Sequence, residues 1–178
     1  MKQKFLSFFL LFYVWQGCQN NNKTQDNESV KEDYYQFQRI DLQKFDIDAE
    51  LMVPDATAGI GASFKPEIVH SPGDFKWIVK IGRNFELNIE DYGDNSFRFL
   101  EMRKKLLKNK IFKIEILKEQ NNQILFIRNM DKTYHVYAVK KLGDIHYEFT
   151  CRESGYTKKV AEFIFKSIQS FKKIKNEH

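Results

Sequence analysis

Hydrophobic and polar residues alternate with a period of two over several stretches of this chain. From Phe45 to Val53 the odd-numbered residues are apolar and acidic side chains stand between most of them. This alternation is typical of a strand with one face buried. The same pattern runs through Phe75–Ile81 and Phe85–Tyr92, and these two segments meet at Gly82-Arg83-Asn84, which predicts a β-hairpin.

Four further segments with strand character follow in the second half of the chain. They are Ile111–Lys118, Ile124–Arg128, Tyr134–Lys141 and Ile145–Cys151. Short polar or glycine-containing turns separate the members of each pair. Consecutive strands with short connections predict an antiparallel meander.

Two segments change to a helical period instead. The residues Asp94, Asn95 and Ser96 are candidate N-caps for a helix that extends to about Lys108. Its apolar stripe is expected to hold Phe99, Met102, Leu106 and Leu107. A second helix is expected over Thr157–Phe171, with a stripe of Val160, Phe163, Ile164, Ile168 and Phe171. The sequence therefore predicts the α+β class, with an antiparallel sheet of about six to eight strands and two main helices packed on it.

The N-terminus has a different composition from the rest of the chain. Lys2 and Lys4 precede an apolar run from Phe5 to Trp15. Because a helix needs about 20 apolar residues to cross a bilayer, this run is too short for a permanent anchor. It predicts a cleavable export signal.

The residues that follow the run resemble the lipobox of bacterial lipoproteins. Gly17 matches the small residue that the family has directly before its cysteine, whereas Trp15 and Gln16 depart from its usual Leu and small residue. The resemblance implies that residues 1–17 are a signal peptide and that Cys18 becomes the lipidated first residue. It further implies a membrane-anchored protein of the bacterial cell envelope, with Gln19 favouring the outer membrane.

Residues 19–33 are polar, and Val30 is the only aliphatic residue among them. Such a segment buries too little apolar surface to fold by itself. It predicts a flexible tether with a reach of roughly 20 Å. Residues 34–178 then form a single α+β domain of ordinary length.

Charge adds a candidate contact surface. The chain has a formal net charge of +5, and Lys2 and Lys4 in the signal account for two of these charges. The first predicted helix carries most of its basic residues on one side, namely Arg98, Arg103, Lys104, Lys105 and Lys108. This side favours anionic lipid headgroups or an acidic envelope protein as a partner. Nucleic acid is not expected outside the cytoplasm.

The segment Pro54–Asp74 contains all three prolines and predicts a long loop. Its residues Gly59, Gly61 and Phe64 are candidate contacts for a partner. Two glycines at this spacing are too few for a dinucleotide-binding fingerprint, so no cofactor is expected. The acidic alternation before the loop lacks the glycine and the distal glutamate of a calcium-binding EF-hand, so no metal is expected.

The chain has only two cysteines, and lipidation of the first leaves Cys151 without a disulfide partner. Cys151 is then either a buried small hydrophobic residue or a nucleophile activated by His135. A three-residue turn after Lys141 sets His135 opposite Cys151, whereas a two-residue turn sets it opposite Arg152. The sequence leaves both registers open.

The order of elements resembles the PsbP-like superfamily of α/β/α domains. The resemblance covers about Phe37 to Lys175 and rests on Val53-Pro54, on the segment Gly143-Asp-Ile-His-Tyr-Glu-Phe149, and on Lys166-Ser-Ile-Gln-Ser-Phe171. It implies a non-catalytic binding or assembly module. A lipid or small-ligand carrier and an envelope enzyme that uses Cys151 and His135 are the alternatives.

Overall fold

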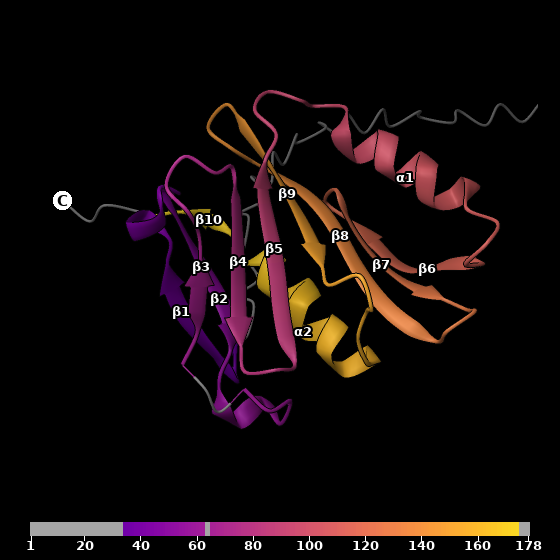
Figure 1. Cartoon of the computed structure of the whole chain (residues 1–178), viewed down its shortest axis with the longest axis horizontal. Helices are drawn as coiled ribbons and strands as arrows, with labels where there is room; N and C mark the ends of the chain where they lie inside the picture. Colours follow the sequence, from indigo (N-terminus) through magenta and orange to yellow (C-terminus); the bar gives the residue numbers. More distant parts are fainter. Residues whose placement is uncertain (1–33, 63–64, 175–178) are drawn as a thin grey trace, which may run out of the picture. The chain divides into compact units, whose positions relative to one another are not determined.

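The computed structural model describes residues 34–62 and 65–174, and residues 33–178 form one compact unit (Figure 1). A three-stranded sheet has the order β1-β2-β10 and a seven-stranded sheet has the order β3-β4-β5-β9-β8-β7-β6. The strands of the small sheet are β1 (Phe37–Asp41), β2 (Ala49–Pro54) and β10 (Lys172–Lys173). Those of the large sheet are β3 (Glu67–Val69), β4 (Lys76–Ile81), β5 (Phe85–Asp91), β6 (Ile114–Gln120), β7 (Gln123–Arg128), β8 (Thr133–Leu142) and β9 (Ile145–Cys151).

Two α-helices accompany the sheets, α1 (Arg98–Lys108) and α2 (Lys158–Gln169), and two short 3-10 turns cover Gln43–Phe45 and Ala56–Ala58. All neighbouring strands are antiparallel. The predicted α+β class is therefore confirmed, although the strands divide between two sheets. The hairpin β4-β5 and the meander β6 to β9 are confirmed, whereas β1, β3 and β10 were not predicted.

The helices α1 and α2 lie on opposite faces of the seven-stranded sheet. On β7 and β8, Phe126 and Tyr137 pack in the cluster that contains Phe99 of α1. The intervening residues, such as Leu125 and Ala138, pack in the main core with α2. Alternate residues along β7 and β8 thus pack into two separate hydrophobic layers, one on each face of the sheet.

The main core lies between the two sheets and surrounds α2. Ile164 and Ile168 of this helix are fully buried together with Leu51 of β2 and Phe149 of β9. The Met52 backbone N–H donates to Ser170 Oγ at 2.8 Å, which joins the small sheet to the end of the helix. Burial on two sides explains why α2 is the most apolar helix of the domain.

Two-residue turns determine the register of the meander. Asn121 and Asn122, between β6 and β7, have φ angles of 50° and 56°. Positive φ at both positions is the geometry whose twist matches a two-stranded ribbon. Gly143 and Asp144 join β8 to β9, because Leu142 is paired with Ile145. Of the two turn lengths that the sequence left open between these strands, the two-residue turn is therefore the observed one.

The predicted strand Phe45–Val53 is shorter in the structure. Asp46 adopts a left-handed conformation with φ of 65°, and β2 begins only at Ala49. Burial still alternates through this segment, since Ile47, Ala49, Leu51 and Val53 are all buried. The hydrophobic pattern correctly identified the inward residues but not the start of the strand.

Two further predictions were wrong in part. Leu107, expected in the buried stripe of the first helix, is exposed. The segment Pro54–Asp74 contains the 3-10 turn Ala56–Ala58 and the short edge strand β3, which pairs with β4. The candidate Phe64 lies outside the described residues, as do the predicted signal peptide, Cys18 and the tether.

The packing predicts a strong effect of truncation in α2. Ile168→Ala removes a fully buried side chain between the two sheets and is expected to lower the free energy of unfolding by about 2–5 kcal/mol. Ile111→Ala, at an exposed position, is the matched control and should change it by less than about 0.5 kcal/mol. Urea denaturation measures both values, and equal effects would contradict the proposed core.

Candidate functional site

Exposed apolar side chains lie on α1 and directly beside its two ends. The large ones are Phe97 (69% exposed), Leu100 (61%), Leu107 (55%) and Ile111 (72%). Because a helix turns by about 100° per residue, Leu100, Lys104 and Leu107 lie within about 60° of one another, next to the side that holds Phe99 and Met102. We call Phe97, Leu100, Lys104, Leu107, Lys108 and Ile111 the outer face of α1.

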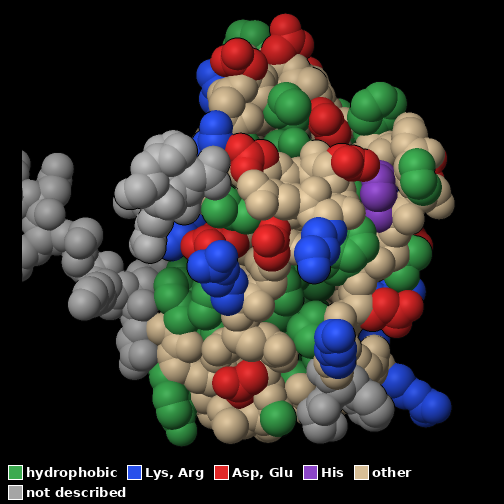
Figure 2. Space-filling model, turned by 90° about the vertical axis from the view of Figure 1, so that its left-hand side faces the viewer, with side chains coloured by type: hydrophobic (Ala, Val, Ile, Leu, Met, Phe, Trp, Pro, Cys, Tyr) green, Lys and Arg blue, Asp and Glu red, His purple; other side chains and the backbone are tan. Residues whose placement is uncertain are grey.

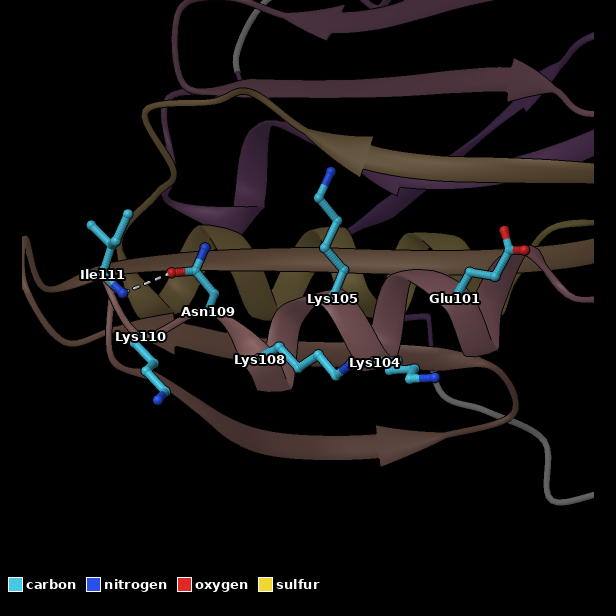
Figure 3. Close-up of a pocket in the computed structure, with 7 residues that line it drawn as sticks. All are labelled: Glu101, Lys104, Lys105, Lys108, Asn109, Lys110 and Ile111. Carbon is cyan, nitrogen blue, oxygen red and sulfur yellow. Dashed lines mark hydrogen bonds between the residues drawn. The ribbon is translucent and has the colours of Figure 1, made fainter.

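Lysines lie beside this apolar surface. Lys104, Lys105, Lys108 and Lys110 line a hollow of about 640 Å³ together with Glu101, Asn109 and Ile111 (Figure 3). Figure 3 shows Lys105 pointing upward from the helix, whereas Lys104 and Lys108 extend along its near side. The Ile111 backbone N–H donates to Asn109 Oδ1 at 3.1 Å, which holds the chain in place after the helix.

Within the described chain, these four lysines form no ion pair, and Glu101 is the one acid on the helix. The two arginines that the sequence grouped with them are engaged elsewhere. Arg103 Nε lies 2.6 Å from Glu119 Oε1 of β6, and Arg98 turns inward to β9. The structure therefore keeps Lys104, Lys105 and Lys108 together and separates Arg98 from them.

Arg98 belongs to a buried polar cluster beneath the start of α1. Its Nε donates to Glu148 Oε2 at 2.5 Å and its Nη2 to Glu148 Oε1 at 3.2 Å. Glu148 is only 5% exposed and also accepts a hydrogen bond from the Tyr137 hydroxyl at 2.8 Å. Arg98 Nη2 donates to Tyr92 Oη at 3.0 Å, and its guanidinium carbon lies 4.2 Å from the centre of the Tyr92 ring.

Electrostatics in this cluster favour the charged pair. The hydrogen bond to Glu148 raises the pKa of Arg98 above its ordinary value. Burial raises the pKa of Tyr137, and the neighbouring carboxylate raises it further. Tyr137 thus remains a neutral donor. A bidentate pair with extra hydrogen bonds is the arrangement that makes a buried carboxylate tolerable.

Cys151 and His135 do meet, although their strands are not in the register that places them opposite each other. Cys151 Sγ lies 3.7 Å from His135 Nδ1 and accepts a hydrogen bond from the Val136 N–H at 3.4 Å. His135 Nε2 lies 2.9 Å from Thr133 Oγ1, which donates to Asp131 Oδ1 at 2.6 Å. The sequence analysis missed this connection, although Asp131, Thr133 and His135 alternate along the chain.

Burial keeps both His135 and Cys151 in their uncharged forms. Burial lowers the pKa of His135 to about 4, and Arg128 adds to this effect. Burial raises the pKa of the Cys151 thiol to about 11. At neutral pH the pair is therefore an uncharged imidazole beside an uncharged thiol, whereas a nucleophilic cysteine needs a lowered pKa.

Gly155 closes the other side of the imidazole. A Cβ atom at this position would lie 2.5 Å from His135 Nε2, and the glycine has a φ of 68°. Only glycine fits both the backbone conformation and the available space. The packing of Gly155 against His135 further indicates a structural role for the pair.

Gly59 and Gly61 line a separate hollow of about 350 Å³ beside the start of α2. Lys159 Nζ donates to the Gly59 carbonyl at 3.4 Å, and Asn84 Nδ2 donates to the Ile60 carbonyl at 3.0 Å. Arg152 also lines the hollow and donates to the carbonyls of Gly155 and Arg83. The bonds from Lys159 and Asn84 therefore hold the loop that contains Gly59 and Gly61.

The remaining surface offers less distinct features. Figure 2 shows acidic and basic side chains interspersed on the side of the domain that carries β1 and β3. In residues 34–62 and 65–174, no three His, Cys, Asp or Glu side chains gather as a metal site. None of the helices in that part of the chain has the length and apolar character needed to cross a membrane.

The cluster around Glu148 predicts a non-additive effect on stability. Arg98→Met leaves a buried carboxylate without its cation and should lower the free energy of unfolding by about 3 kcal/mol. The double variant Arg98→Met/Glu148→Gln removes the charge as well and should recover a large part of that loss. Chemical denaturation of both variants provides the comparison; a double variant no more stable than the single one would argue against the buried pair.

The thiol environment predicts slow alkylation. At pH 8, a thiol pKa of about 11 leaves roughly 100-fold less thiolate at Cys151 than an ordinary cysteine has. Iodoacetamide labelling, followed by mass spectrometry of the Cys151 peptide, should therefore be at least about 100-fold slower in the native than in the unfolded chain. Fast native labelling would support the enzyme alternative.

Comparison with known proteins gives no match: no family model matches the chain, and neither a curated protein nor a solved structure matches it.

Proposed function

We propose that this chain is a lipid-anchored protein of the bacterial cell envelope whose folded domain acts by binding rather than by catalysis. The observation that carries the binding role is the outer face of α1, where exposed Leu100 and Leu107 lie beside Lys104 and Lys108. Exposed apolar side chains that gather on one element with charged residues beside them favour a contact surface.

The anchoring role is supported by the residues at the N-terminus. The basic start, the short apolar run and Gly17-Cys18 together favour export followed by lipidation of Cys18. Lipidation with a second acyl chain gives stable attachment to a membrane. The layout that resembles the PsbP-like superfamily agrees with a module that binds or assembles.

The two alternatives have less support. An enzyme that uses Cys151 and His135 would have to ionise a thiol whose pKa burial raises to about 11. A lipid or small-ligand carrier would have to open the main core, where Phe85 and Phe149 are fully buried and Phe149 packs against Phe171 at a ring distance of 5.0 Å. We therefore favour the binding module.

Metabolic labelling tests the anchoring part of the proposal. Cells that express the full chain are grown with an alkyne-tagged fatty acid, and the label on the protein is detected after purification. Wild type should carry the label and sediment with membranes, whereas Cys18→Ser should lose both properties. Cys151→Ser is the matched control and should keep both. An unlabelled wild-type chain, or a labelled Cys18→Ser chain, would contradict lipidation at this residue.

A further inference from the structure

We infer that the outer face of α1 is a second membrane contact, which lays the folded domain on a surface of anionic phospholipid. This inference names the partner of the surface proposed above and rests on that proposed function. It assigns one side of α1 to the sheet and the other side to the lipid.

The geometry of the helix separates these two roles. Phe99, Met102 and Leu106 pack on the sheet, in one cluster with Phe126 and Tyr137. On the exposed part of the helix, Leu100 and Leu107 lie two turns apart, and both are more than half exposed. Phe97 and Ile111, which flank the helix, are exposed as well. We call these four exposed side chains the apolar ridge of α1.

The charges beside the ridge suit an anionic bilayer. Lys104, Lys105, Lys108 and Lys110 carry four positive charges against the single Glu101 of the segment 97–111, once Arg98 and Arg103 are paired with Glu148 and Glu119. A lysine side chain can place its methylene groups along apolar surface while its ammonium group reaches the headgroups. An exposed apolar stripe with lysines beside it is the pattern of a helix that lies in the membrane interface.

A protein partner fits this surface less well. Interfaces between proteins favour tyrosine, tryptophan and arginine in their cores and disfavour lysine. The outer face of α1 has lysines but neither tyrosine nor tryptophan, and both arginines of the helix are engaged with acidic side chains of the sheet. A second copy of the chain would bring two lysine-rich faces together, and their charges would repel.

The proposed anchor adds a further argument. The sequence predicts a tether over residues 19–33 with an r.m.s. reach of roughly 20 Å, so the proposed anchoring at Cys18 would keep the domain close to the lipid surface. At such a high effective concentration, a weak interfacial contact is sufficient for a large bound fraction.

Vesicle partitioning tests the inference without the lipid anchor. Residues 19–178 contain the whole compact unit 33–178 and lack Cys18, so the result does not depend on lipidation. The protein is mixed at about 0.1 M salt with phosphatidylcholine vesicles that contain either no or one third phosphatidylglycerol, and bound protein is measured by sedimentation. Binding should require phosphatidylglycerol.

Variants at exposed positions locate the contact. Each lysine near an anionic surface contributes about a five-fold gain in binding, so Lys104→Ala/Lys108→Ala should reduce partitioning about 30-fold. Lys44→Ala/Lys141→Ala removes the same charge from exposed positions outside α1 and should leave partitioning unchanged. Leu100→Ser/Leu107→Ser should reduce it at least about tenfold, whereas Met130→Ser, at an exposed site outside the ridge, should not.

The possible outcomes are distinct. Equal losses from the two lysine pairs would show a general charge effect and overturn the inference, as would no binding to either vesicle. Self-association that Leu100→Ser/Leu107→Ser abolishes would assign the face to a second copy instead. If vesicles bind as predicted but fatty-acid labelling of Cys18 fails, the lipid contact stands and the anchoring proposal falls.

Discussion

The buried pair between Glu148 and Arg98 is the constraint on which the arrangement of α1 depends. A carboxylate at the centre of a sheet face is costly to bury unless a cation and further hydrogen bonds reach it. Arg98, the first residue of α1, supplies the cation, and Tyr137 supplies a hydrogen bond from the neighbouring strand. With its first residue held at β9, the helix can pack only one of its sides on β7 and β8. The opposite side must face solvent.

The consequence is a helix that has apolar residues outside the side that packs on the core. Phe99 and Met102 pack against the sheet, whereas Leu100 and Leu107 have no layer to cover them in the described domain. The other helix, α2, shows the contrast, because sheets lie on two of its sides and bury Ile164 and Ile168 completely. An apolar side that the fold leaves exposed among lysines is better explained by contact with a membrane surface than by the stability of the domain.

Part of this arrangement was accessible from the sequence. Strict alternation identified the inward residues of β2 and β5, since period two is a local property of the chain. Leu107 lies at the edge of the predicted buried stripe, and a helical pattern does not tell how far around the helix that stripe extends. Arg98 was grouped with the surface lysines because its partner Glu148 is 50 residues away in the sequence. The contact between Cys151 and His135 was proposed from one of two registers, yet the atoms meet in the other.

Photocrosslinking in the native envelope tests most directly whether α1 rests on lipid. A benzophenone amino acid replaces Leu100 in the intact chain, and cells are irradiated before the protein is purified and its adducts are identified by mass spectrometry. The account predicts adducts of phospholipid mass at position 100 and none from the same probe at Met130. Adducts at position 100 that consist of protein alone would contradict it.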